Sequence, residues 1–180
     1  MEHADITIIG AGVIGLAIAR ELAAHKRETV VLEQHPAFGQ ENSSRNSEVI
    51  HAGLYYPPES LKARLCARGR ELLYAYCSRY RIAHRRIGKL VVATTDEERD
   101  AVDRIYRNAL ACGVKGLRFL TTDEIVRYEP SISVRGALYS PETGIFDTHA
   151  FMKSLFLAGK EGGVMYSFGT RVSALKPVPD

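Results

Sequence analysis

Apolar residues fall along this chain in two patterns, short continuous runs and longer stripes at helical spacing, and the two alternate. The short runs predict strands at residues 6–9, 29–32, 90–93, 136–139, 164–168 and 171–175. The helical stripes, some preceded by capping patterns, predict helices over about 13–24, 59–80, 95–112, 121–129 and 148–158. Strands that alternate with helices are typical of an α/β fold, and we expect the run 6–9 to be buried on both faces of its sheet.

A glycine pattern joins the first predicted strand to the first helix. Gly10, Gly12 and Gly15 follow the run 6–9 as G-x-G-x-x-G, and Glu33 comes after the second predicted strand. In a dinucleotide-binding βαβ unit, the first glycine makes the tight turn and the second lets the backbone approach a pyrophosphate. The third glycine allows the helix to lie close to the strand, and the acid binds a ribose hydroxyl. Because a helix N-terminus also favours phosphate, the sequence predicts a Rossmann-like dinucleotide site.

This fingerprint leaves the cofactor open. A carboxylate at Glu33 disfavours NADP, whose 2′-phosphate it would repel, but FAD and NAD fit the pattern equally well. The alternative without a ligand is a tight turn in an ordinary parallel sheet. Such a turn needs neither Gly12 nor the acid, so a dinucleotide is the better interpretation.

Composition narrows the class of protein further. The chain has 180 residues, 46% of them hydrophobic, and a formal net charge of +3, so it can build a full core. Its three cysteines form no CxxC pair, which indicates small apolar residues in a reducing compartment, and we expect no metal site. The apolar run 6–19 is too short to span a membrane and lacks the basic start of a signal peptide, so we expect a cytoplasmic protein.

The stretch 62–89 is rich in Lys and Arg. A solvated helix face is the simplest interpretation of this charge. Because no nucleic-acid motif accompanies it, we expect no nucleic-acid partner. A peripheral contact with an anionic membrane, on its cytoplasmic face, stays open.

A second segment separates FAD from NAD. Residues 43–56 are dense in hydroxyl groups and include one Arg, donors that suit a second phosphate face or a flavin edge. The motifs that follow one another are N-S-x-V-I-H-A-G-x-Y-Y at 46–56, S-L-K-A-x-L-C at 60–66, G-K-L-V-V-A at 88–93, E-P at 129–130 and T-G-I-x-D at 143–147. With these motifs the chain resembles the D-amino-acid-oxidase-like (DAO) superfamily of FAD-dependent oxidoreductases, and within it the L-2-hydroxyglutarate dehydrogenase/oxidase branch. Glu48 departs from that branch, which tends to carry Gly there, and the departure bears on the substrate.

The resemblance implies FAD as the cofactor and a small 2-hydroxy acid as the substrate, with L-2-hydroxyglutarate, oxidised to 2-oxoglutarate, as the best single choice. It puts the FAD pyrophosphate on the three glycines and the ribose on Glu33. Further cofactor contacts are implied for Ser44, Arg45, Asn46, Ser47 and the backbone of Val172. His51 is expected near the flavin, where a histidine is suited to accept the hydroxyl proton, although a purely structural histidine fits as well. Arg45 suits a substrate carboxylate as much as a phosphate.

The same resemblance implies a longer protein, because family members have a C-terminal half that completes the fold. It divides this chain into an incomplete, discontinuous FAD-binding domain, residues 1–82 and 145–180, and the first part of an inserted α+β substrate domain, residues 83–144. The chain is therefore expected to be a truncated, N-terminal part of such an enzyme. A non-catalytic remnant and an NAD-binding module are the alternatives, and contact with a membrane quinone stays open.

Overall fold

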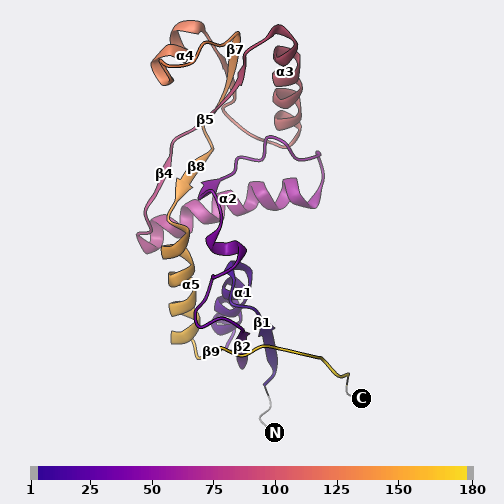
Figure 1. Cartoon of the computed structure of the whole chain (residues 1–180), viewed down its shortest axis with the longest axis vertical. Helices are drawn as coiled ribbons and strands as arrows, with labels where there is room; N and C mark the ends of the chain where they lie inside the picture. Colours follow the sequence, from indigo (N-terminus) through magenta and orange to yellow (C-terminus); the bar gives the residue numbers. More distant parts are fainter. Residues whose placement is uncertain (1–3, 178–180) are drawn as a thin grey trace. The chain divides into compact units, whose positions relative to one another are not determined.

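The computed structural model describes residues 4–177 and divides into two compact units. The first unit combines the two ends of the chain, Met1–Ser47 and Asp147–Asp180, and the second is the continuous stretch Glu48–Phe146. The elements of each unit can be followed by their labels in Figure 1.

A parallel sheet with two helices forms the first unit. Its elements are β1 (Ile6–Ile9), α1 (Val13–Ala24), β2 (Thr29–Glu33), the 3-10 turn η1 (Asn42–Ser44), α5 (Thr148–Glu161) and β9 (Met165–Phe168). The strands run in the order β1-β2-β9, and both pairs are parallel, with Ile6 opposite Thr29 and Val30 opposite Met165. Helices α1 and α5 pack against each other. Leu16, Val31, Met152 and Leu155 are among the buried apolar residues of this unit.

Short antiparallel strands and three helices form the second unit. Its elements are β3 (Val49–Ile50), α2 (Leu61–Tyr80), β4 (His84–Arg86), β5 (Lys89–Ala93), α3 (Asp96–Ala111), β6 (Arg118–Leu120), α4 (Thr122–Tyr128), β7 (Gly136–Ser140) and β8 (Gly144–Phe146). They make two three-stranded sheets, β3-β8-β4 and β5-β7-β6. Val102 of α3 packs with Leu138 on the second sheet, and Ile125 of α4 packs with Ala137 on it.

The predicted α/β class and the predicted helices are confirmed. The capping patterns also hold, since Thr95 with Glu98 and Thr121 with Glu124 both form complete capping boxes at the starts of α3 and α4. Residues 171–175, however, are extended without being a strand, so that prediction is wrong. Their apolar pattern is typical of a strand. A strand also needs hydrogen bonds to a neighbouring strand, and the pattern of apolar residues does not predict those bonds.

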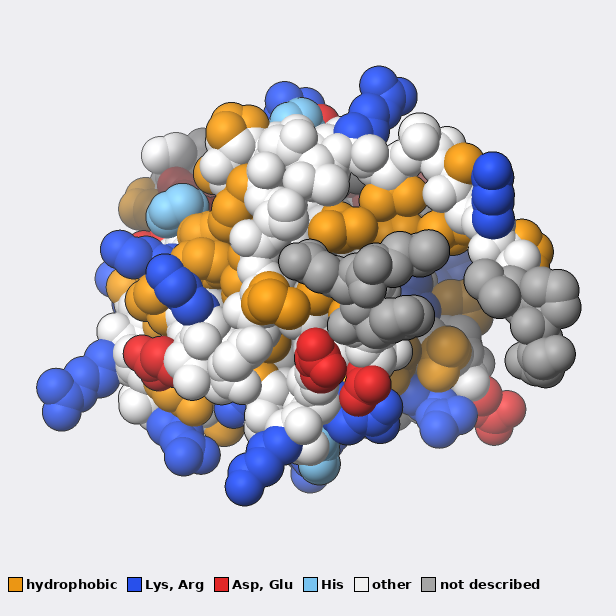
Figure 2. Space-filling model, turned by 90° about the horizontal axis from the view of Figure 1, so that it is seen from below, with side chains coloured by type: hydrophobic (Ala, Val, Ile, Leu, Met, Phe, Trp, Pro, Cys, Tyr) orange, Lys and Arg blue, Asp and Glu red, His pale blue; other side chains and the backbone are white. Residues whose placement is uncertain are grey.

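The prediction of a doubly buried first strand is also wrong. β1 lies at the edge of its sheet and pairs only with β2 in the described part of the chain, and Ile9 is 56% exposed. Ile14 on α1 is 74% exposed. Hydrophobic side chains reach the surface in the view of Figure 2 as well, where they lie among Lys and Arg side chains.

The compact units differ from the predicted domains at one boundary. Helix α2 belongs to the unit Glu48–Phe146, whereas the predicted FAD-binding domain extends to residue 82. Contacts of Arg70 and Tyr74 with Ala52 and Glu142 tie the helix to this unit. The functional division into domains stays a prediction. Among the described residues, no helix is both long and apolar enough to cross a membrane.

A buried arginine stabilises the second unit. The Nη1 of Arg70 donates to the carbonyl oxygen of Ala52 at 2.9 Å, and its Nε lies 3.4 Å from a carboxylate oxygen of Glu142, an ion-pair contact without hydrogen-bond geometry. The other oxygen of Glu142 is 3.4 Å from Arg86, and the backbone carbonyl of Glu142 accepts from the Tyr74 hydroxyl. The arginine therefore holds the segment that follows β3 against α2.

We expect Arg70→Met to lower the free energy of unfolding by about 2 kcal/mol, because it leaves the Ala52 carbonyl without its buried donor and removes the buried positive charge beside the Glu142 carboxylate. Arg68→Met is the matched control. Arg68 pairs with Glu71 on the surface of the same helix, so its loss should change stability by less than about 0.5 kcal/mol. Urea unfolding followed by circular dichroism measures both, and equal effects of the two variants would contradict this role of Arg70.

Candidate functional site

The predicted phosphate-binding turn has the geometry that its glycines suggested. Gly10 has φ +100°, in the left-handed region that side chains disfavour. Gly12 is the N-cap of α1, and a Cβ added there would come within 3.0 Å of the Ser43 hydroxyl oxygen. A Cβ on Gly15 would overlap the carbonyl oxygen of Gly10 and press on Ile8. Gly12 and Gly15 therefore leave no room for side chains, and Gly10 supplies the backbone angle of the turn.

The N-terminus of α1 is a suitable anion site. Its first turn carries no acidic residue, and the N-cap residue makes no side-chain cap bond. The Val13 N–H instead donates to the Ser43 hydroxyl at 3.0 Å, across 30 residues of sequence. Sequence reasoning did not select Ser43, although it belongs to the hydroxyl-rich segment, because only the fold brings it to this helix end. Ser43 joins the candidate cofactor residues on this contact.

Glu33 is buried at the end of β2, and its carboxylate is already engaged. One oxygen accepts the Ala11 N–H at 2.7 Å, and the other accepts the His35 N–H at 2.8 Å. A carboxylate has about four lone-pair sites, so two bonds leave capacity for ribose hydroxyls. Glu33 therefore has a structural role in addition to the ligand role predicted for it.

The remaining cofactor candidates of the first unit have different surroundings. Ser44 donates its hydroxyl to the Glu41 carbonyl, and Arg45 is largely exposed, 3.9 Å from the Glu41 carboxylate. Asn46 donates to the Ser43 carbonyl at 2.9 Å and approaches the Thr148 hydroxyl at the start of α5. Asn46 thus helps to position Ser43. Exposed Ser47 and half-buried Val172 lie in stretches without helix or strand.

A groove of about 610 Å³ lies in the same unit beside Ser44. Phe38 stacks at 5.2 Å on Phe156 and at 5.8 Å on His149, ring centroid to ring centroid. Lys153 also lines the groove. Aromatic faces with cationic neighbours at the rim suit a flat or apolar ligand that carries negative charge.

His51, the predicted catalytic residue, lies in the second unit directly after β3. Its backbone carbonyl is 3.4 Å from the Cys66 sulfur on α2, and its imidazole is at the surface. Partial burial, then the positive charges of Lys89 and Lys62, lower the pKa of His51 below its ordinary value of 6.5. The imidazole is therefore neutral at pH 7, the form that accepts a proton.

The cysteines near this segment are not reactive thiolates. Burial raises the pKa of the Cys66 thiol, and burial raises the pKa of Cys77 to about 11. All three cysteines, including Cys112, are free. Among residues 4–177, no group of three or more His, Cys, Asp or Glu side chains is arranged to hold a metal ion.

Glu48, where the sequence departs from the hydroxyglutarate branch, has φ +56°. A side chain in this left-handed region costs about 1 kcal/mol, and glycine avoids the cost. The carbonyl of Glu48 accepts the Phe146 N–H at 3.1 Å, in the sheet that carries β3. The departure at this position therefore has a cost in the backbone, and its bearing on the substrate stays a prediction.

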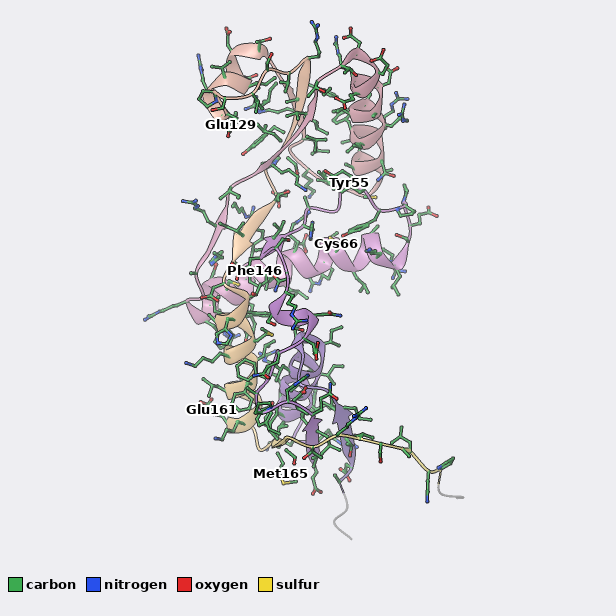
Figure 3. All side chains as sticks on the ribbon, in the orientation of Figure 1. Tyr55, Cys66, Glu129, Phe146, Glu161 and Met165 are labelled. Atoms are coloured by element: carbon green, nitrogen blue, oxygen red, sulfur yellow. The ribbon has the colours of Figure 1, made fainter. Side chains whose placement is uncertain are left out.

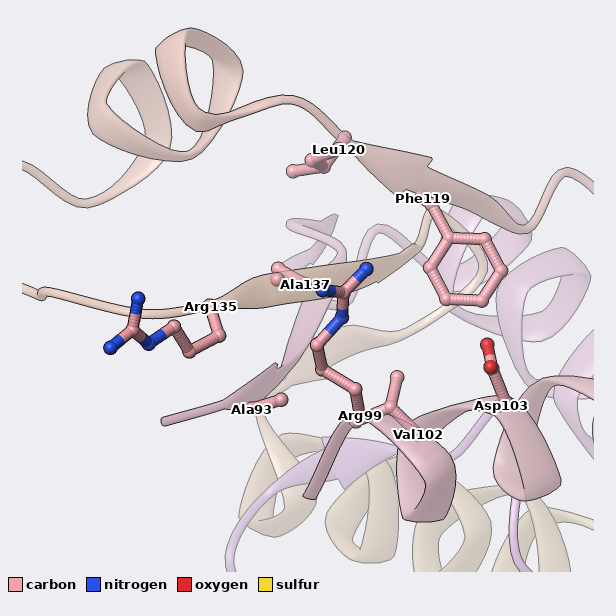
Figure 4. A pocket seen from close by; sticks show the side chains of 9 residues that line it. Ala93, Arg99, Val102, Asp103, Phe119, Leu120, Arg135 and Ala137 are labelled. Carbon is pink, nitrogen blue, oxygen red and sulfur yellow. The ribbon is translucent and has the colours of Figure 1, made fainter. Parts of the chain in front are cut away.

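A second hollow of the Glu48–Phe146 unit, of about 310 Å³, lies beside α3 and the sheet β5-β7-β6 (Figure 4). Arg99, Asp103 and Arg135 supply its charged groups, and Phe119 is among its apolar side chains. None of the predicted site residues lines it, so it is a separate feature of this unit.

Comparison with protein families matches residues 5–180 to the DAO family, described as FAD dependent oxidoreductase. Among solved structures, the chain is similar to a dithionite-reduced, FAD-bound L-α-glycerophosphate oxidase from Mycoplasma pneumoniae. The TM-score is 0.89 at 28% identity, and the match covers 96% of this chain and 46% of that one. A glycine oxidase from Geobacillus kaustophilus gives a TM-score of 0.85 at 27% identity, covering 96% and 48%.

Curated relatives are named mitochondrial L-2-hydroxyglutarate dehydrogenase. The Arabidopsis thaliana protein is 54% identical over 154 residues, which are 86% of this chain and 32% of that protein. The Homo sapiens protein is 42% identical over 145 residues, 79% of this chain and 31% of that one. The chain thus spans about a third of the length of these relatives. Their mitochondrial names contradict the prediction of a cytoplasmic protein, which rested on the lack of an export signal alone.

We expect Gly15→Ala to lower the free energy of unfolding by about 2 kcal/mol, because the new methyl group overlaps the Gly10 carbonyl. Gly69→Ala is the control. Gly69 lies in α2 with nothing within 4 Å of an added Cβ, so alanine should stabilise the chain by up to about 1 kcal/mol. Thermal melts compare the two, and a neutral Gly15→Ala would show that α1 and β1 are not packed this closely.

Proposed function

Because the chain belongs to the DAO family of FAD-dependent oxidoreductases, we propose that it is the cofactor-binding part of an enzyme that oxidises L-2-hydroxyglutarate to 2-oxoglutarate. The observation that carries the substrate is 54% identity to a relative named L-2-hydroxyglutarate dehydrogenase. The match covers 32% of that relative. We therefore assign the rest of the enzyme to sequence outside these 180 residues.

The described residues fit FAD. Gly10, Gly12 and Gly15 would admit the pyrophosphate, the first N–H groups of α1 and the Ser43 hydroxyl would hydrogen-bond it, and Glu33 would hold the ribose. Ser44, Arg45, Asn46, Ser47 and the backbone of Val172 are the further proposed contacts. Bound FAD would supply a two-electron oxidant for the hydrogen on the carbon that bears the substrate hydroxyl.

His51 is the proposed general base. Oxidation of the hydroxy acid removes a hydride from carbon 2 and a proton from the hydroxyl group, and leaves the carbonyl of the oxo acid. A neutral imidazole accepts that proton, and the lowered pKa of His51 keeps it neutral at pH 7. Arg45 is proposed as a phosphate ligand, because it belongs to the same unit as the glycine turn.

The proposal includes two partners besides the substrate. A C-terminal half would supply further strands and flavin contacts. Exposed Ile9 on the edge strand β1 and exposed Ile14 on α1 give it an apolar surface to cover. A membrane quinone is proposed as the electron acceptor, with the exposed arginines of the basic stretch 62–89 as the contact to the membrane surface.

The direct test is cofactor uptake and reduction. We expect the purified chain, mixed with FAD, to retain a flavin with absorbance near about 450 nm. L-2-hydroxyglutarate should bleach this absorbance, whereas lactate and glycerol 3-phosphate should not. A chain that retains no added FAD contradicts the cofactor proposal for this part of the enzyme, and bleaching by lactate alone contradicts the substrate.

We expect His51→Gln to slow the reduction of bound flavin by L-2-hydroxyglutarate by about 100-fold or more, because it removes the proton acceptor. For the unaltered chain, the rate should be constant at neutral pH and fall only as the pH drops below 6.5, where the imidazole becomes protonated. His25→Gln, on the exposed end of α1, should leave rate and profile unchanged. A rate that rises as the pH falls from 7 to 5 would rule out His51 as the base.

A further inference from the structure

Two lysines lie over the rings of two tyrosines that follow His51 in the sequence. The Nζ of Lys62, at the start of α2, lies 4.7 Å from the ring centroid of Tyr56. The Nζ of Lys89, at the start of β5, lies 5.2 Å from the ring centroid of Tyr55. The two tyrosines follow His51 closely in sequence, so one short segment gathers both ammonium groups. Tyr55 on this segment and Cys66 on α2 are labelled in Figure 3.

Both ammonium groups act on the same imidazole. Lys89 and Lys62 are the two charges that lower the pKa of His51, and their effect is repulsion of a third positive charge. The two lysines come from different elements, Lys62 from α2 and Lys89 from β5. The fold therefore concentrates positive charge around the residue proposed as the base.

Among the described residues, no acidic side chain forms an ion pair with either lysine. In the part of the chain that the structure describes, neither Lys62 nor Lys89 has a carboxylate within 4.0 Å, and the nearby ion pairs of Glu142 go to Arg70 and Arg86. Tyrosine faces attract a cation weakly and leave its other donors available for an anion. Both ammonium groups disfavour a positive charge on His51, and a bound anion would offset this repulsion.

We propose that Lys62 and Lys89 form a receptor for a dicarboxylate, in which each lysine binds one carboxylate of the substrate. The receptor rests on the proposed function. It adds to that function the two residues that would distinguish a five-carbon hydroxy diacid from a hydroxy acid with one carboxylate. A ligand with two separated negative charges matches two separate cations on two elements. Removal of one lysine should therefore affect a dicarboxylate more than a monocarboxylate.

The test is binding of glutarate to the full chain, which needs neither FAD nor turnover. We expect glutarate to bind, and Lys62→Met and Lys89→Met each to raise its dissociation constant about tenfold by calorimetry. Lys62→Arg and Lys89→Arg keep the charge and should retain most of the affinity. Lys115→Met, at an exposed lysine of the same unit, is the control and should bind as the unaltered chain does.

The His51 imidazole gives a second readout by NMR. Each Lys→Met variant should raise the pKa of His51 in the free chain, and glutarate should raise it in the unaltered chain. Unchanged glutarate affinity in both Met variants overturns the receptor. Inorganic phosphate or acetate that binds as tightly as glutarate overturns the preference for a dicarboxylate.

The receptor and the proposed function can fail separately. If glutarate binds through the two lysines but L-2-hydroxyglutarate does not reduce bound flavin, the receptor stands and the proposed reaction fails. If L-2-hydroxyglutarate reduces the flavin with an unchanged KM in both Met variants, the reaction stands and the receptor is wrong.

Discussion

The buried carboxylate of Glu33 is the interaction on which the first unit depends. It accepts the Ala11 N–H from the glycine turn and the His35 N–H from the segment after β2, at 2.7 and 2.8 Å. Hydrogen bonds to a charged acceptor are stronger than neutral ones, and a buried carboxylate without them would be costly. The acid thus fixes the turn between β1 and α1 relative to the end of β2, and the ligand site is built on a structural bond that exists without the ligand.

The two units offer complementary chemistry. The first presents backbone N–H groups, the Ser43 hydroxyl and one carboxylate, which suit the phosphates and sugar of a dinucleotide. The second presents an imidazole with two ammonium groups, which suits an anion that must lose a proton. Buried Arg70 supports the second arrangement, because its bond to Ala52 holds the residue next to His51.

Local sequence was sufficient for features that depend on local geometry. The glycine turn, the capping boxes and the helices were predictable because turn angles and caps involve residues a few positions apart. The choice of FAD over NAD, made by resemblance, agrees with the family match. Ser43 could not be found in this way, since its partner Val13 is 30 residues away, and neither could the exposed Ile9 or the failure of 171–175 to pair. The position of a strand in its sheet depends on which strands pair with it, and a run of apolar residues does not specify those partners.

Glu48 has a consequence for how relatives of this protein are compared. Its φ of +56° can be adopted by glycine without strain, whereas a glutamate adopts the same backbone turn at a cost in conformational energy. A difference between Gly and Glu at this position therefore also changes the conformational energy of a single residue.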